Sequence, residues 1–551
     1  MTEVILDIET DDLNATKVYC IVAKDISSGK IYSWKESECY NEFPNFAKTV
    51  TKFIMHNGIS FDAPTLNRLV GTKIRLSQVE DTLLLSQMEN PVRDKGHSLA
   101  SFGLEFGYPK LPSPSFDSFS EEMLTYCIRD VEITHRLYIH LKGFLSKIPR
   151  FPIDLEYKIK TIIDKQVRNG FTLDIQKASL LSCKLKDRAD EIEKDLINRY
   201  EPIVEERFSE KTGKKLKDKV TVFNPASRQQ IADRLEKQGW KPSKFTEKGH
   251  PIVDETTLME SDIPDAKLIA EYLLLQKRVA QIKSWLTLVD GDNKVHGEVL
   301  TLRTISGRMA HTSPNMAQVP AVYSMYGREC RECWTVSSTN NCLVGCDASS
   351  LELRALAHYL DDPKFTKEVV EGDIHTANQM AAGLETRDQA KTFIYAFIYG
   401  AGAEKIGKIV GGGSKEGTKL IQQFLSNVPS LAVFREKISN LSASGYLIGL
   451  DGRRLVVRSQ HAAVNLLIQG AGAVICKQWL VEINNLLTSK KVSAKLVASI
   501  HDEYQFECNT AVAEILGGIT KDAMRLTQER LKVRCQLDSN YKIGQNWAET
   551  H

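Results

Sequence analysis

Long hydrophobic runs, internal repeats and a strong excess of one charge are all lacking in this sequence of 551 residues. A helix that spans a bilayer needs about 20 apolar residues in succession, so we expect no membrane segment and no membrane partner. The opening stretch MTEVILDIET is acidic and strand-like, without the basic region and apolar stretch of a signal peptide. We therefore expect a cytoplasmic protein.

The net charge of +2 neither requires nor excludes a nucleic-acid partner, so a DNA-binding surface would be a local concentration of Lys and Arg. The 11 cysteines are scattered and odd in number, which suits reduced thiols. The order Cys330, Cys333, Cys342 and Cys346 superficially resembles a zinc spacing. Both pairs lie in apolar, strand-like sequence without a turn-forming knuckle, so we expect small buried thiols there.

The chain is too long for one hydrophobic core, and two to four domains of about 100–200 residues are expected. A helical pattern covers residues 121–145, and the two prolines of LSKIPRFPIDLE then indicate a boundary. We predict one long charged helical segment over residues 155–207, a lysine-rich polar loop over 209–219 and a flexible loop, GGGSKEG, over 411–417.

Two acids stand close together near the N-terminus. Asp7 and Glu9 are two residues apart in VILDIET, so both carboxylates project from one face of a predicted strand. The apolar neighbours indicate a buried strand, where two like charges are costly without a cation. An exposed strand edge is the ordinary alternative.

Two further segments of the N-terminal part carry acids. Asp62 follows an apolar run where a helix begins, so it fits an N-cap with Pro64 in the first turn. Tyr126 and Asp130 are four residues apart on a predicted helix and share a face. Taken alone, Asp62 fits an N-cap, and the helix face with Tyr126 and Asp130 fits a solvated surface better than a site.

In CLVGCDASSLELRALAHYL, a strand is predicted to end near Asp347 and a helix to begin near Ser350. Asp347 at a strand end commonly caps the next helix, which is its ordinary interpretation. Glu352, however, faces back from the first helical turn and brings a second carboxylate to the same place.

The stretch TRDQAKTFIYAFIYGAG has helical spacing, so Arg387, Lys391, Tyr395 and Tyr399 form one stripe. Arg and Lys suit phosphates, and Tyr offers an apolar wall for a sugar and a base. A solvated face or a core contact is the alternative. The opposite face can supply the core contact through Ala390, Ile394, Phe397 and Ile398.

The stretch KLVASIHDEYQFEC predicts two strands around a tight turn at His501, Asp502 and Glu503. It is either a solvated hairpin or the place where Asp502 meets Asp347 from a neighbouring strand. Such a pair needs cations, and two magnesium ions would bridge a triphosphate to a 3′-hydroxyl.

Together these segments are more specific than any one of them. Asp-x-Glu on a strand, then Asn57 to Asp62, then Tyr-x-x-x-Asp on a helix resembles the DEDD family of 3′→5′ exonucleases. The three C-terminal segments resemble motifs A, B and C of the DNA polymerase I family, family A. FNPASRQQIADRL, SGRMAHTSPNMAQVP, GDIHTANQMAA and DGRRLVVRSQHAAVNLLIQGAGAVICK look like the replicative polymerases of short-tailed bacteriophages.

The resemblance implies a multidomain α/β and α+β fold: a ribonuclease H-like exonuclease domain followed by a right-hand polymerase. We expect the exonuclease in residues 1–150, thumb and connecting helices in 151–300, palm in 301–372, fingers in 373–480 and palm again in 481–551. The implied activity is DNA-templated DNA synthesis from dNTPs with 3′→5′ proofreading, serving phage genome replication in a bacterial cytoplasm. Implied partners are template-primer DNA, a phage helicase-primase and a single-stranded DNA-binding protein.

The resemblance also implies two Mg²⁺ ions per active site, with Mn²⁺ as a substitute. Their exonuclease ligands would be Asp7, Glu9, Asp62 and Asp130, and Tyr126 would orient the attacking water. Their polymerase ligands would be Asp347, Asp502 and the backbone carbonyl of Ala348; Glu503 would be secondary.

Nucleotide and DNA contacts follow from the same resemblance. The incoming triphosphate would be held by Arg387, Lys391 and His375. Tyr395 would pack on its sugar, and a tyrosine where relatives have phenylalanine implies tolerance of dideoxynucleotides. Glu352 resembles the steric gate against a ribose 2′-hydroxyl. The DNA contacts would be Arg308 and Gln469 in the minor groove and His501 at the primer terminus.

The sequence departs from some phage relatives before the FNP segment, where those carry a long insertion that captures host thioredoxin. Here only the loop 209–219 and its flanks stand there, so thioredoxin is not expected as a subunit. The loop lysines either touch duplex phosphates or are simply solvated: Lys211, Lys214, Lys215, Lys217 and Lys219.

Two rival functions remain. A single-subunit RNA polymerase has similar A, B and C segments, but the N-terminal acids and Glu352 argue against it. A non-catalytic DNA-binding derivative of a polymerase would be expected to have lost metal ligands, and this chain retains all six carboxylates.

Overall fold

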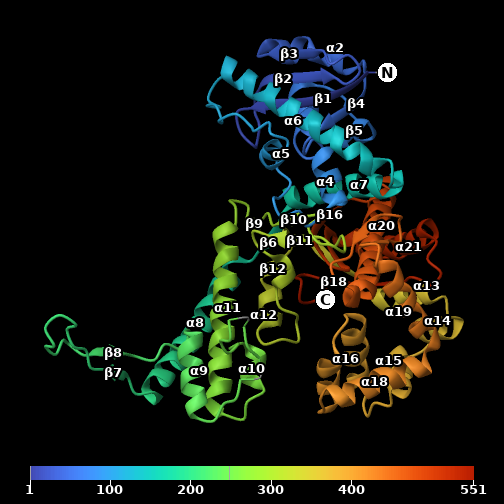
Figure 1. The fold of residues 1–551 in the computed structure, drawn as a ribbon. Coiled ribbons are helices and arrows are strands. Elements are labelled where there is room, and N and C mark those ends of the chain that lie inside the picture. Colours follow the sequence, from blue (N-terminus) through green and yellow to red (C-terminus); the bar gives the residue numbers. More distant parts are fainter. Residues whose placement is uncertain (1, 243, 247) are drawn as a thin grey trace.

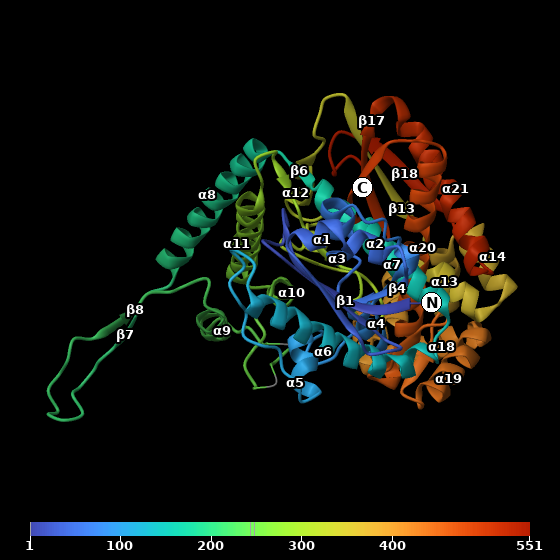
Figure 2. The same ribbon diagram turned by 90° about the horizontal axis from the view of Figure 1, so that it is seen from above.

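The structure is a computed structural model that describes residues 2–242, 244–246 and 248–551, apart from the side chains of Ile374 and His375. Figure 1 shows an N-terminal lobe above a central palm, with two mainly helical arms, called thumb and fingers below, that extend from it. Seen from above in Figure 2, the thumb helices lie to one side and the palm to the other.

The N-terminal lobe is built on a mixed five-stranded sheet in the order β3-β2-β1-β4-β5, with β1 parallel to β4 and antiparallel to β2. Its apolar strands bury side chains on both faces, because helices cover each face. The helical prediction for residues 121–145 is confirmed by α6. The strands are β1 (Thr2–Thr10), β2 (Val18–Asp25), β3 (Ile31–Lys35), β4 (Val50–Met55) and β5 (Val79–Asp81); the helices are α1 (Ser37–Asn41), α2 (Phe43–Ala47), α3 (Asp62–Thr65), α4 (Thr82–Glu89), α5 (Leu99–Glu105) and α6 (Glu121–Leu145).

The prediction of one continuous helical segment over residues 155–207 is wrong. The structure has α7 (Arg150–Asn169), the strand β6 (Phe171–Leu173) and then α8 (Ile175–Arg199). The break is at Gly170, whose φ of 63° favours glycine and whose Cβ, if present, would lie 2.9 Å from the His296 ring. The charge pattern of the segment gave no sign of this break.

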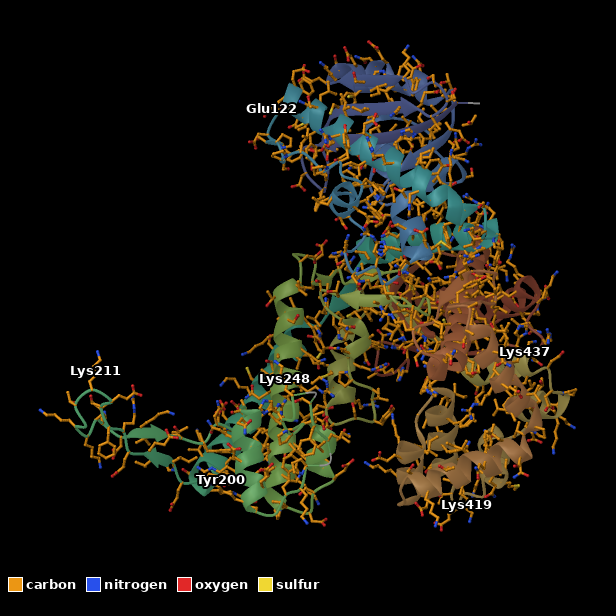
Figure 3. The ribbon with its side chains drawn as sticks, in the orientation of Figure 1. Glu122, Tyr200, Lys211, Lys248, Lys419 and Lys437 are labelled. Atoms are coloured by element: carbon orange, nitrogen blue, oxygen red, sulfur yellow. The ribbon has the colours of Figure 1, made fainter. Side chains whose placement is uncertain are left out.

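The thumb is formed by long antiparallel helices that stand on a small sheet, β12-β6-β9. The predicted polar loop 209–219 is the end of a hairpin that projects away from these helices, with Lys211 at its tip in Figure 3. The elements are α8, β7 (Ile203–Glu205), β8 (Lys219–Thr221), α9 (Arg228–Lys237), α10 (Glu255–Met259), α11 (Pro264–Leu288), β9 (Lys294–Val295), β10 (Glu298–Leu300), β11 (Ala310–Thr312), α12 (Gly327–Glu332) and β12 (Trp334–Thr335).

The palm is an antiparallel four-stranded sheet in the order β16-β17-β13-β18, packed against helices α20 and α21. Its core continues into the fingers without interruption. The palm elements are β13 (Asn341–Ala348), α13 (Leu351–Leu360), α20 (Ala463–Ser489), β16 (Ala494–Ile500), β17 (Glu503–Asn509), α21 (Ala513–Leu531) and β18 (Ser539–Gly544).

Helix α20 is an exception to the expectation that no segment is long and apolar enough to span a bilayer. Residues 460–489 are long and apolar enough by length and composition, and 94% of the apolar window is buried within the protein. Buried core helices of soluble proteins commonly meet the same criterion, because a helix that is apolar all round belongs in an interior.

The fingers contain six helices and a short hairpin within the described part of residues 363–456. The prediction of a flexible loop over residues 411–417 is wrong for residues 414–417, because α18 begins at Ser414. There, Gly417 lets α18 approach α17 closely, since a Cβ would clash with the Ala403 carbonyl oxygen. The elements are α14 (Pro363–Val370), α15 (Ile374–Ala382), α16 (Arg387–Ile398), α17 (Ala403–Gly407), α18 (Ser414–Asn427), α19 (Pro429–Ser442), β14 (Tyr446–Ile448) and β15 (Arg454–Val456).

Helix α7 joins the N-terminal lobe to the palm through a buried charge network. Glu156 of α7 is fully buried and accepts hydrogen bonds from Lys477 of α20 at 2.7 Å to both oxygens. Arg453 lies 2.7 Å from Glu156 and also pairs with Asp451, so two cations face two acids. Burial lowers the pKa of Lys477 to about 8. At the first residue of α7, Arg150 contacts Glu80 of the N-terminal lobe at 2.8 Å.

We predict that Lys477→Met destabilises the folded chain by about 3 kcal/mol, because removing one partner leaves a buried charge incompletely compensated. Urea unfolding followed by tryptophan fluorescence measures this change. Lys490→Met is the matched control, because Lys490 caps the end of the same helix in a half-exposed ion pair with Asp522. Its cost should be within about 1 kcal/mol. An equal effect of the two substitutions would contradict the prediction.

Candidate active sites

The N-terminal lobe gathers four acids from three elements. Asp7 and Glu9 lie on β1, the middle strand of the sheet, opposite Val22 and Cys20 of β2. Asp62 is the first residue of α3 and only 3% exposed; the N-cap position is held by Phe61, so the N-cap interpretation of Asp62 is wrong. Asp130 comes from α6, which packs against β1.

Burial and mutual repulsion dominate the electrostatics of these four acids. Burial raises the pKa of Glu9 to about 8, and the charge of Asp130 adds to the shift. Burial also raises the pKa of Asp62 to about 8. The pKa of Asp7 lies well above its usual range, because it is buried and because Asp62, Asp130 and Glu9 repel its charge. The carboxylates therefore favour bound protons or a multivalent cation.

The acid cluster fits divalent metal ions. Oδ1 of Asp130 is buried and has no hydrogen-bond partner among the described residues, so an acceptor is left for another ligand. The donor atoms are carboxylate oxygens, which hard ions such as Mg²⁺ prefer.

Two residues of this site escaped sequence reasoning. Lys110 Nζ lies 2.5 Å from Asp130 Oδ2 and 4.6 Å from the centre of the Tyr126 ring. Cys127 Sγ lies 3.7 Å from Asp7 Oδ2, and burial raises the pKa of this thiol well above its usual range. Cys127 thus acts as a neutral donor to Asp7. Its place three residues before Asp130 on α6 was a usable signal, because that spacing puts both on one face, whereas Lys110, in a loop, gave none.

The palm brings together the acids of two distant segments. Asp347 on β13 pairs in register with Glu503 on β17, and the Ala348 amide donates to the Asp502 carbonyl at 3.0 Å. Partial burial and the charge of Asp502 raise the pKa of Asp347 to about 7. Burial likewise raises the pKa of Asp502. The turn predicted at residues 501–503 is confirmed for His501 and Asp502, whereas Glu503 already begins β17. The turn places Asp502 at the end of β13.

Glu503 is held differently from its two neighbours. Its carboxylate accepts from the Trp547 indole at 2.6 Å and contacts His551 Nδ1 at 2.8 Å. Burial raises its pKa, but the hydrogen bond and charge of His551, together with the charge of Arg331 at 3.8 Å, outweigh burial and leave the pKa below its usual range. Trp547 and His551 come from the end of the chain, and their part in this site had no signal in the sequence.

Helix α16 presents the predicted stripe. Thr386 caps the helix, Lys391 is exposed, and the rings of Tyr395 and Tyr399 stack with centroids 6.3 Å apart. The core assignment of the opposite face is confirmed, because all four of its residues are buried: Ala390, Ile394, Phe397 and Ile398.

Two cations of the predicted site are already paired with acids. Arg387 donates to Asp373 at 2.6 Å through Nε and 3.2 Å through Nη2. Arg308 lies 2.7 Å from Glu352, whose carboxylate also accepts from the Tyr399 hydroxyl at 2.7 Å. Sequence reasoning had placed Tyr399 on the stripe but missed its bond to Glu352, and it missed Asp373.

Two of the predicted DNA contacts, Arg308 and His501, lie near Asp502. Arg308, His501 and Asp502 line one small hollow against α20. His501 has a φ of 56° in the turn, and Gln469 is half-buried on α20. The His375 side chain lies outside the described part of the structure.

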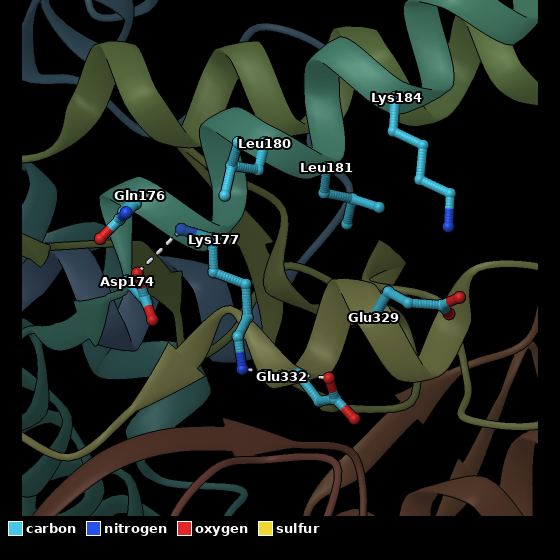
Figure 4. A pocket seen from close by; sticks show the side chains of 8 residues that line it. All are labelled: Asp174, Gln176, Lys177, Leu180, Leu181, Lys184, Glu329 and Glu332. Atoms are coloured by element: carbon cyan, nitrogen blue, oxygen red, sulfur yellow. Dashed lines mark hydrogen bonds and ion pairs between the residues drawn. The ribbon is translucent and has the colours of Figure 1, made fainter.

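A larger surface cavity of about 420 Å³ lies away from both acid clusters, between the start of α8 and α12 (Figure 4). Lys177 and Glu332 face each other across it at 3.9 Å. The cysteine quartet is divided between two cores: Cys330 and Cys333 pack with the thumb, Cys342 and Cys346 with the palm.

Comparison with known proteins gives a fold from structure and a family from sequence. A solved polymerase domain of Pol1 from M. smegmatis, in complex with DNA primer-template and dNTP, matches with a TM-score of 0.82 at 16% identity, covering 100% of this chain and 96% of that one. This match confirms the predicted fold class. The DNA-directed DNA polymerase of Enterobacteria phage T3 is 32% identical, covering 99% of both chains, and that of Escherichia phage T7 is 31% identical over 100% of both.

The profile of DNA polymerase family A matches residues 194–549, which include the thumb helices from α9 to α11, the palm acids and α16. Because this match spans more than half of the sequence and two phage DNA polymerases align with it from end to end, the chain belongs to DNA polymerase family A.

Proposed function

We propose that the palm site extends a DNA primer by two-metal phosphoryl transfer from dNTPs, and that the N-terminal site removes nucleotides from a 3′-end. The observation that carries the first activity is the meeting of Asp347 and Asp502 beside α16. Tyr395 of α16 is close enough that, besides burial, the charges of Glu352, Asp502 and Asp347 raise its pKa. The palm acids and the nucleotide-binding stripe therefore belong to one site.

Asp347, Asp502 and the carbonyl of Ala348 would hold the metal ions in the palm. Family A polymerases generally depend on divalent metals, which supply charge neutralisation for the triphosphate and a lowered pKa for the primer hydroxyl. The chain itself supplies position and charge. Lys391 is exposed and can meet the triphosphate directly, whereas Arg387 must first exchange its Asp373 partner for phosphate oxygens.

Sugar selection would rest on Glu352 and Tyr395. Arg308 and Tyr399 hold the Glu352 carboxylate from two sides, so its position is fixed before a nucleotide arrives. A fixed carboxylate beside the sugar excludes a 2′-hydroxyl more sharply than a mobile one. This arrangement favours a DNA polymerase over the rival RNA polymerase, and a preference for ribonucleotides in an incorporation assay would overturn that choice.

The N-terminal site supports proofreading. Asp7, Glu9, Asp62 and Asp130 would hold two ions, and Tyr126 would orient the attacking water. Three buried acids, the half-buried Asp7 and an Asp130 oxygen without a hydrogen-bond partner among the described residues support this assignment. Template-primer DNA and dNTPs are the substrates we propose, with a phage helicase-primase and single-stranded DNA-binding protein as replication partners in the host cytoplasm, and without thioredoxin.

The thumb hairpin is the proposed DNA grip outside the active site. Two of its lysines pair with acids of the same hairpin, Lys215 with Glu206 at 2.5 Å and Lys219 with Glu205 at 3.1 Å. Lys211 extends from the tip of the hairpin in Figure 3.

The two active sites should be separable by substitution. We expect Asp502→Ala to lower primer extension at least about 100-fold, since a metal ligand is lost, and to leave degradation of single-stranded DNA unchanged. Asp7→Ala should do the reverse. Extension with dNTPs and degradation without them measure the two activities. Asp522→Ala is the control, because Asp522 is an exposed acid on α21. Loss of both activities in a folded Asp502→Ala or Asp7→Ala variant would contradict the prediction of two independent metal sites.

Tyr395→Phe should increase discrimination against dideoxynucleotides by roughly 100-fold, because a hydrogen-bonding group beside the sugar is removed. The ratio of kcat/KM for a deoxynucleotide to that for its dideoxy analogue measures the change. The deoxynucleotide value itself should change little. An unchanged ratio would contradict the placement of Tyr395 against the sugar.

Replacing the five hairpin lysines with alanine should shorten the products made in a single binding event and reduce the salt dependence of DNA binding. Glu205, Glu206 and Glu210 on the same hairpin provide an opposite control, since their change to glutamine should lengthen the products. Unchanged product lengths in both variants would mean that the hairpin is only solvated.

A further inference from the structure

Lys110 lies in the acid cluster but does not come from any of the helices or strands that carry the four acids. It comes from the segment between α5 and α6, residues 106–120. Its ammonium lies 2.5 Å from Asp130 Oδ2, and the two side chains are 25% and 6% exposed. A half-buried ion pair inside a cluster of like charges is a stronger constraint than a surface pair of the same length.

The same segment clamps Tyr126. The Lys110 ammonium lies over the Tyr126 ring at 4.6 Å, and the Phe116 ring meets Tyr126 edge to face at 6.5 Å and 83°. Tyr126 and Asp130 are neighbours on one face of α6, so a single lysine contacts both. Cation–ring and edge-to-face contacts both restrict the orientation of a tyrosine.

We propose that Lys110 is a positioning residue of the exonuclease site, acting as an internal counter-ion that holds Asp130 and Tyr126 in place. It neutralises Asp130 through Oδ2 before divalent ions bind, while Oδ1 stays open to them. When the ions bind, Lys110 competes with them for Asp130 and still orients the Tyr126 ring. This inference rests on the proposed exonuclease function of the four acids.

The proposal predicts two effects of opposite direction for Lys110→Met, which keeps the apolar stem and removes the charge. Affinity for divalent ions at the empty site should rise by roughly 5-fold, because a competing cation is lost. The kcat for single-stranded DNA cleavage should fall by roughly 10–100-fold, because the groups that orient the reaction are less well held. Lys110→Arg keeps the charge and should recover most of the cleavage.

The affinity is measured by calorimetric titration of Mn²⁺ into the full chain carrying Asp502→Ala, which silences the palm site. Cleavage is measured in the chain with an intact palm, where primer extension should be unchanged and reports correct folding. Lys24→Met is the matched control: Lys24 pairs with Glu132 of the same helix at 2.6 Å, with 13% and 21% exposure, outside the acid cluster. It should change neither Mn²⁺ affinity nor cleavage.

The outcomes separate the possible roles. Tighter Mn²⁺ binding with slower cleavage supports the proposal. Weaker binding with slower cleavage overturns it, because that result makes Lys110 a merely structural support; unchanged cleavage also overturns it. If the unmodified chain neither cleaves single-stranded DNA nor loses an Mn²⁺ site on Asp7→Ala, the proposed exonuclease function fails instead, whatever Lys110→Met does.

Discussion

The repulsion between carboxylates held close together is the constraint on which both sites depend. Four acids share the N-terminal site, and Asp347 and Asp502 meet in the palm, with raised pKa values in both places. Repulsion would move these carboxylates apart unless the backbone that carries them is held rigidly. Accordingly β1 is the middle strand of its sheet, and β13 is an inner strand of the palm sheet, bonded on both sides. Each sheet is packed against a large buried core, and the stability of that core offsets the repulsion between the acids of the site.

Counter-charges from other segments complete these sites. Lys110 faces Asp130, Arg308 faces Glu352, and Arg387 faces Asp373. For Arg387 we propose that nucleotide binding exchanges Asp373 for phosphate oxygens, whereas Arg308 keeps Glu352 in place. Exchange costs less than desolvating an unpaired charge, because the acid or base is never left bare in the interior. Helix α7 fixes the two lobes through Glu156 and Arg150, so both sites share one frame.

Sequence-based prediction succeeded for features that depend on residues within a single helix or turn. The helix over residues 121–145, the two faces of α16 and the turn at 501–502 all follow from periodicity and flanking residues. The failures occurred where packing overrode a local pattern. Gly170 ends a segment whose charges read as continuous helix, since its conformation and its contact with His296 decide the break. The loop predicted over 411–417 fails from Ser414 onward, because α18 begins there and its Gly417 packs closely against α17.

The sequence by itself determined which acids are present, their order along the chain and the helical stripe of Arg387, Lys391, Tyr395 and Tyr399, because spacing within one element fixes a shared face. Only the tertiary structure decided which side chains compensate those acids. Glu503 is anchored by His551, 48 residues away, and Glu156 by Lys477, 321 residues away. Lys110 reaches Asp130 from a loop without any pattern of its own. Contacts of this kind leave no local signature, since they depend on where separate elements dock against a common core.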